Sequence, residues 1–110
     1  MSWKILSEPN QVSEIIEASK QKPQLFFKHS TRCSISTMAL SRFEKSGILT
    51  NEHLDCWYLD LLEFRQISSE IEKLTKVIHQ SPQAILVHNE QMVYTESHGM
   101  IDAVEILKLV

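Results

Sequence analysis

The apolar positions along the chain follow two rhythms, one typical of helices and one typical of strands. Over residues 11–18 they recur on one face at helical spacing, and Pro23 follows, so we expect a helix that ends before position 23. The next apolar run, residues 24–29, is short and lacks clean alternation. Such a run is typical of a buried strand in a parallel pair.

A helix, a strand and another helix are predicted next. Apolar side chains recur every three or four positions from residue 35 to residue 43, and Gly47 supplies a stop. Residues 56–61 have the composition of a strand, and helical spacing returns from residue 64 to residue 78.

The last third of the chain predicts a hairpin and a closing helix. Residues 84–88 and 92–95 flank a polar turn, and residues 101–110 carry an apolar face. The order is βαβ, a helix, then ββα, behind an additional N-terminal helix. It predicts an α/β, thioredoxin-like fold with a central mixed four-stranded sheet flanked by helices. No linker or repeat interrupts the pattern, so residues 1–110 are expected to form a single domain.

Composition and charge exclude several classes of function. The chain has 110 residues, 43% of them hydrophobic, and a net charge of -3 without a cluster of Lys and Arg. Binding of nucleic acid or of an anionic membrane surface is therefore not expected. No apolar run reaches the roughly 20 residues needed to cross a bilayer, and the first residues lack the apolar core of a signal peptide. We therefore expect a cytoplasmic protein.

The cysteines are the strongest functional signal. There are two, Cys33 and Cys56, with no CxxC pair and no spacing known for zinc, so no metal is expected. Cys33 lies where the strand at 24–29 gives way to a helix. Free backbone N–H groups and the helix dipole stabilise a thiolate there, and Arg32 and Lys28 add positive charge. A thiolate is the nucleophile of disulfide exchange.

A plainer alternative is that Cys33 is an ordinary buried cysteine. The Ser, Thr and Arg residues beside it favour exposure instead. Cys56 stands in a predicted strand, where burial makes a thiol inert. Because Cys33 follows the end of one strand and Cys56 begins its parallel neighbour, the two should lie roughly 15–20 Å apart, too far for a disulfide.

A resemblance to a known family adds to this picture. The run Phe-Lys-His-Ser-Thr-Arg-Cys-Ser-Ile-Ser at 27–36, with Ser81-Pro82-Gln83 and Ser97-His98 downstream, resembles the YtxJ family of monothiol bacilliredoxins. The resemblance implies a thioredoxin-like protein that removes bacillithiol from protein mixed disulfides, with bacillithiol as co-substrate and no bound cofactor. Its partners would be bacillithiolated proteins and bacillithiol. One departure is Ser34, where the family commonly has proline.

Several residues acquire candidate roles from this resemblance. Dithiol relatives carry a second cysteine where this chain has Ser36, so we expect a monothiol cycle in which the Ser36 hydroxyl supports the Cys33 thiolate. The alternative is a surface serine. Arg32, next to the nucleophile, is a candidate substrate-binding residue.

Three further residues are candidates for the substrate groove. Thioredoxin-like proteins place a cis proline before the third strand, facing the cysteine, and Ser81–Pro82 stands at that point. The alternative is a trans proline that merely starts a strand. His98 is expected near the groove, whereas His29 is expected to be a hydrogen-bonded turn residue.

Two classes of function remain open. One is a thiol–disulfide oxidoreductase that turns over through Cys33. The other is a non-catalytic, thioredoxin-like module for thiol sensing or protein binding, in which Cys33 is modified without turnover. A recycling assay on a bacillithiolated protein distinguishes them.

Overall fold

The computed structural model describes residues 3–110, which form one sheet of five strands in the order β1-β3-β2-β4-β5. The strands are β1 (Lys4–Ile5), β2 (Gln24–His29), β3 (Asp55–Asp60), β4 (Gln83–His88) and β5 (Gln91–Ser97). Strands β1, β3 and β2 are parallel, and β4 and β5 form an antiparallel hairpin at the other side of β2. This is the predicted α/β arrangement of βαβ followed by ββα.

The prediction of four strands was one short. The additional strand, β1, has only two residues, both exposed, which pair with Trp57 and Tyr58 at the edge of the sheet. A strand of this length has no room for a repeating pattern of apolar and polar residues, so the sequence alone does not reveal it.

The predicted helices are all present. They are α1 (Asn10–Ala18), α2 (Ser34–Lys45), α3 (Arg65–Thr75) and α4 (Ala103–Leu107), with short 3₁₀ turns η1 (Ile48–Thr50) and η2 (His98–Met100). Helix α4 is shorter than the expected 101–110. It begins at residue 103 because the Asp102 side chain accepts a hydrogen bond from Val104 N at 2.9 Å and caps the helix. Within residues 3–110, none of the helices is long and apolar enough to span a membrane.

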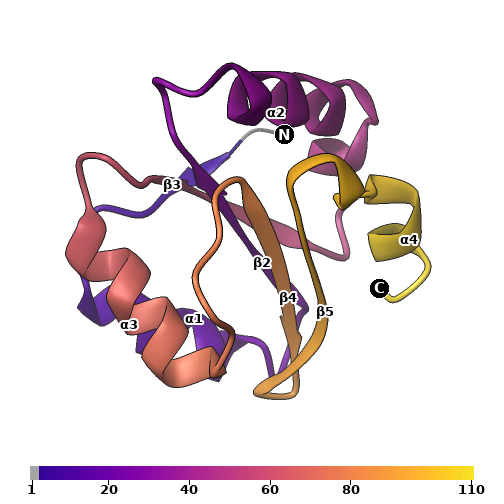
Figure 1. Ribbon diagram of the computed structural model, residues 1–110. Helices are drawn as coiled ribbons and strands as arrows, with labels where there is room; N and C mark the ends of the chain where they lie inside the picture. The colour runs from indigo at the N-terminus through magenta and orange to yellow at the C-terminus, as the bar shows by residue number, and fades with distance from the viewer. Residues whose placement is uncertain (1–2) are drawn as a thin grey trace.

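Helices cover both faces of the sheet (Figure 1). One core lies between the sheet and helices α1 and α3, and contains Phe26 and Ile85. The other lies under α2 and α4 and contains Leu25 and Phe27. Successive residues of β2 therefore serve opposite cores, as the two-residue period of a strand requires. Lys28 and His29, the last two residues of β2, also point to opposite faces.

Three chain segments that lie far apart in the sequence meet at one end of the strands. In the register of the sheet, Lys28 pairs with Gln83, and Gln83 pairs with Ser97. The end of β2, the start of β4 and the end of β5 consequently lie side by side at this end of the sheet (Figure 1). The segments that carry Cys33, Pro82 and His98 all leave the sheet there.

Candidate active site

Cys33 stands at the start of α2, as the sequence predicted. It is the N-cap residue, with an extended backbone (φ -109°, ψ 122°), and its N–H donates to Ser30 O at 3.2 Å to close a tight turn. The thiol is half-buried, and the first turn of α2 contains no acidic side chain. A helix N-terminus without a nearby carboxylate favours negative charge, so this position suits a thiolate.

Ser36 lies beneath the turn rather than on the surface. It is the third residue of α2 and is 0% exposed. Its Oγ accepts a hydrogen bond from Ser30 N at 3.0 Å and is 2.8 Å from His29 Nδ1. The expected bond to Cys33 is not among the hydrogen bonds of residues 3–110. Ser36 instead holds the turn that carries Cys33 to the end of β2.

His29 is a strand residue and not the turn residue that we expected. It ends β2, is 4% exposed, and its ring lies 5.7 Å from that of Tyr58. Burial lowers the pKa of His29, while the carboxylates of Asp60 and Glu44 partly oppose this effect. The sequence feature that predicts this orientation is the two-residue period of a strand, which places the His29 side chain on the same face as Phe27, toward α2.

The Ser81–Pro82 peptide bond is cis, which confirms the prediction at that position. Pro82 is buried directly before β4, and Ser81 is half-buried. The carbonyl of Pro82 accepts a hydrogen bond from His98 N at 3.0 Å. Two of the predicted site residues are therefore joined directly across the hairpin.

The two remaining features are at the surface. His98 is exposed and opens η2 with a positive φ of 55°, a region that non-glycine residues seldom adopt. Arg32 is exposed in the turn before Cys33. Arg32 is thus the exposed charged residue next to Cys33 in the chain, and His98 is hydrogen-bonded to Pro82 at the same end of the sheet.

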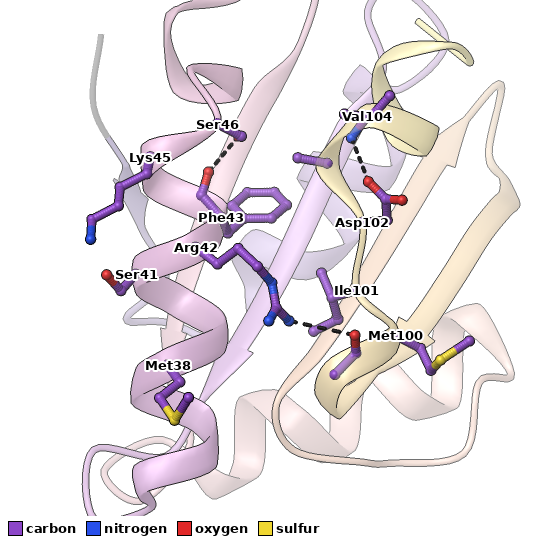
Figure 2. A pocket seen from close by; sticks show the side chains of 12 residues that line it. Met38, Ser41, Arg42, Phe43, Lys45, Ser46, Met100, Ile101, Asp102 and Val104 are labelled. Atoms are coloured by element: carbon purple, nitrogen blue, oxygen red, sulfur yellow. Dashed lines mark hydrogen bonds between the residues drawn. The ribbon is translucent and has the colours of Figure 1, made fainter.

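A groove of about 990 Å³ runs between the outer side of α2 and the segment 99–104 (Figure 2). Met38 and Met100 lie at its lower end in this view, and Arg42 Nη2 donates to Gly99 O at 3.5 Å across it. Cys33 does not line this groove. The groove and the thiol are therefore separate features of α2.

Cys56 is a buried thiol inside a strand, whereas Cys33 is half-buried at the start of a helix. It is 5% exposed, and burial, with a smaller contribution from Asp55, raises the pKa of its thiol to about 12. It pairs with Leu25, whereas His29 pairs with Asp60 at the other end of the same two strands. Cys33 and Cys56 thus lie at opposite ends of the paired strands β2 and β3, as the predicted parallel pairing required.

Residues 3–110 contain no group of three or more His, Cys, Asp or Glu side chains that could hold a metal ion.

The chain is similar to known proteins in sequence and in fold. The family model "Monothiol bacilliredoxin BrxC" matches residues 4–106. A solved structure of a candidate oxidoreductase with a thioredoxin fold is 34% identical, with a TM-score of 0.79 over 94% of this chain and 89% of that chain.

More distant likenesses show the fold alone. The thioredoxin of Malassezia sympodialis is 20% identical, with a TM-score of 0.72 over 98% of this chain and 87% of that chain. The thioredoxin of Fasciola hepatica is 8% identical, with a TM-score of 0.73 over 96% of this chain and 94% of that chain.

Because the family model spans nearly the whole chain, including Cys33 and the segments that surround it, this protein belongs to the monothiol bacilliredoxin family.

Proposed function

We propose that the protein is a monothiol thiol–disulfide oxidoreductase that removes bacillithiol from protein mixed disulfides. The observation that carries the proposal is Cys33 itself, a half-exposed cysteine at the N-terminus of α2 with a serine three residues later. Membership of the bacilliredoxin family, which implies the bacillithiol system, supports the choice of substrate. The cycle needs free thiols, so the reducing cytoplasm is its proposed location.

The proposed cycle consists of two disulfide exchanges. The Cys33 thiolate attacks the bacillithiol sulfur of the mixed disulfide, a Cys33–bacillithiol disulfide forms, and the target protein leaves as a thiolate that takes a proton from water. A second bacillithiol thiolate then attacks the mixed disulfide on Cys33. Cys33 is released reduced, and the two bacillithiol molecules leave as their disulfide. Bacillithiol is thus both the group removed and the reductant, and no bound cofactor takes part.

The residues around the thiol have proposed binding roles. Arg32 places a positive charge next to the forming thiolate and the incoming substrate, and His98 lies beside Pro82 at the same edge. Ser81 and Pro82 precede β4, and the proposed role of the Ser81 backbone is to pair with an extended segment of the target protein. Ser36 supports the site from below by holding the turn at Ser30.

Ser34, the departure from the family pattern, fits this site. It is the first residue of α2, a position where proline is also well accommodated. Serine keeps the backbone N–H that proline lacks, so this chain has one more donor at the helix N-terminus beside the thiolate. The helix start is therefore preserved, and the serine adds to its positive end.

Turnover with a bacillithiolated protein tests the proposal. With bacillithiol in excess, the wild type should release many equivalents of reduced target, Cys33→Ser should release none, and Cys56→Ala should retain the wild-type rate. A single equivalent of release, with Cys33 left modified, would instead indicate a thiol-sensing module. Activity that persists in Cys33→Ser would overturn the proposal altogether.

A further inference from the structure

His29 and Ser36 form a buried hydrogen-bonded pair directly beneath the turn that carries Cys33. Ser36 is 0% exposed and His29 is 4% exposed, and 2.8 Å separates Ser36 Oγ from His29 Nδ1. The exchange cycle proposed above assigns no task to His29. A titratable ring that is buried one residue before the active-site turn calls for an explanation.

The hydrogen bonds of the Ser36 hydroxyl show what this pair can do. A hydroxyl donates one hydrogen bond and accepts two. The Ser30 N–H occupies one acceptor position at 3.0 Å, so one donor and one acceptor position remain. His29 Nδ1 takes one of them. The other is available to Cys33, the N-cap residue, because residues three positions apart at a helix start are neighbours on the same side of the helix.

We propose that His29 receives the proton of the Cys33 thiol through the Ser36 hydroxyl. The Cys33 side chain turns about its Cα–Cβ bond so that the S–H group donates to Ser36 Oγ, while the hydroxyl donates to an unprotonated His29 Nδ1. The thiol proton then moves to Ser36 Oγ as the hydroxyl proton moves to Nδ1. The products are a thiolate that accepts from Ser36 and an imidazolium that donates to Ser36, so protons and charges balance.

The hydroxyl is fully hydrogen-bonded both before and after this transfer. Ser36 Oγ accepts from Ser30 N–H in both states, and its other two positions only exchange direction between His29 and Cys33. A buried hydroxyl that can relay a proton without losing a partner pays no desolvation penalty. The relay therefore fits the local geometry in both protonation states.

The charges that face His29 decide how readily the proton stays there. Asp60, its register partner on β3, and Glu44 on α2 both favour the imidazolium, and the Tyr58 ring packs beside it. Burial alone disfavours the charged ring and is the larger effect. The imidazolium is therefore held mainly while the thiolate is present, because the two charges stabilise each other.

His29 acts through Ser36 and does not touch the sulfur, so it is a positioning residue. A purely structural role is separated from proton transfer by two substitutions. His29→Asn keeps a side-chain amide near the Nδ1 position, which can still bond to Ser36 but cannot take up a proton. His29→Phe removes both abilities while retaining a ring against Tyr58.

Alkylation of Cys33 by iodoacetamide at pH 7, in a Cys56→Ala background, measures the effect. We expect His29→Asn, His29→Phe and Ser36→Ala each to slow alkylation roughly tenfold, as loss of one hydrogen bond to a charged group requires. The double variant His29→Asn/Ser36→Ala should be no slower than either single variant. The matched control is His88→Asn, a histidine at the opposite end of the sheet, and it should react like the wild type. A wild-type rate in His29→Asn would overturn the relay.

Direct observation of the His29 ring keeps the test decisive even if a variant fails to fold. Nitrogen-15 shifts of the imidazole should show that His29 holds its second proton to higher pH in the reduced wild type than after Cys33 is alkylated. An identical titration in the two forms would overturn the relay. The inference rests on the proposed function only for the use made of the thiolate. Neither measurement involves bacillithiol, so a failed turnover assay with an intact relay would remove the proposed function alone.

Discussion

Lys28 and His29 are neighbours on β2, yet they serve different parts of the molecule. Both side chains are buried, both can carry a charge, and each lies within hydrogen-bonding distance of a partner on its own face of the sheet. His29 faces α2 and reaches Ser36 beneath Cys33. Lys28 faces α3, where its Nζ donates to His79 Nδ1 at 3.3 Å. The burial is similar, so the helix on each face decides what the residue does.

The Lys28 side of the sheet is built to hold a helix and a loop together. Ser68 Oγ on α3 also lies 3.1 Å from His79 Nδ1, and His79 N donates to Glu72 at 3.0 Å. These bonds tie the loop that leads to Pro82 onto α3. We therefore expect changes on this face to alter stability, and changes on the His29 face to alter the reactivity of Cys33.

The largest expected effect is the loss of the Lys28 side chain. Lys28→Ala removes a fully buried stem and leaves a cavity, which should lower the free energy of unfolding by about 2–4 kcal/mol. Lys28→Met fills nearly the same space without burying a charge, so its cost should stay below about 1.5 kcal/mol. Urea unfolding at pH 7 measures both. Equal losses in the two variants would show that the bond to His79, and not packing, is what stabilises this face.

The second prediction concerns how the contribution of Lys28 to the free energy of unfolding changes with pH. Burial lowers the pKa of Lys28 from 10.5 to about 8. Between these values the unfolded chain binds a proton that the folded chain has lost, so stability contributed at this site rises with pH. The unfolding free energy of the wild type relative to Lys28→Met should therefore increase from pH 8 to pH 10. Burial of Cys56 acts in the opposite direction above about pH 9, but it is common to both proteins and cancels in the difference.

A flat difference over this pH range would show that Lys28 holds its proton in the folded protein as firmly as in the unfolded chain. Burial of His29 should instead affect the free energy of unfolding at acidic pH. Its pKa is lowered from 6.5 mainly by burial, so the unfolded chain takes up a proton first as the pH falls, and stability is lost on acidification.

Sequence reasoning succeeded where one residue determines a local structure. The start of α2 at Cys33 and the positions of Cys33 and Cys56 at opposite ends of the strands followed from local patterns and strand pairing. The cis Ser81–Pro82 bond followed from the resemblance to thioredoxin-like proteins. Sequence reasoning failed for the two-residue strand β1, which has no repeating pattern.

The buried polar pairs were out of reach for a different reason. A lysine inside a strand is normally read as exposed, because a charge is costly to bury, and nothing local to Lys28 reveals that His79 lies over it. The same holds for the contact between His29 and Ser36, seven residues apart, which depends on how α2 packs on the sheet. Each of these contacts is tertiary, so only the folded arrangement shows it.

The smallest expected effect comes from a pair of serines that occupy comparable places on the two faces. Ser68 is 5% exposed and bonds to His79, as Ser36 is 0% exposed and bonds to His29. Ser68→Ala leaves His79 Nδ1 with its bond from Lys28, so it should cost about 1 kcal/mol or less.

Ser36→Ala removes the partner of two groups at once, the half-buried Ser30 N–H and the buried His29 Nδ1. Its cost in unfolding free energy should therefore be larger, about 1–3 kcal/mol, and it should be accompanied by slower alkylation of Cys33. Ser68→Ala should leave alkylation unchanged, because its serine faces α3 and not the thiol. Urea unfolding and iodoacetamide kinetics on the same two proteins measure both quantities. If Ser68→Ala slowed the reaction as much as Ser36→Ala, the two faces of the sheet would be coupled, and the separation between a stabilising Lys28 side and a reactive His29 side would be wrong.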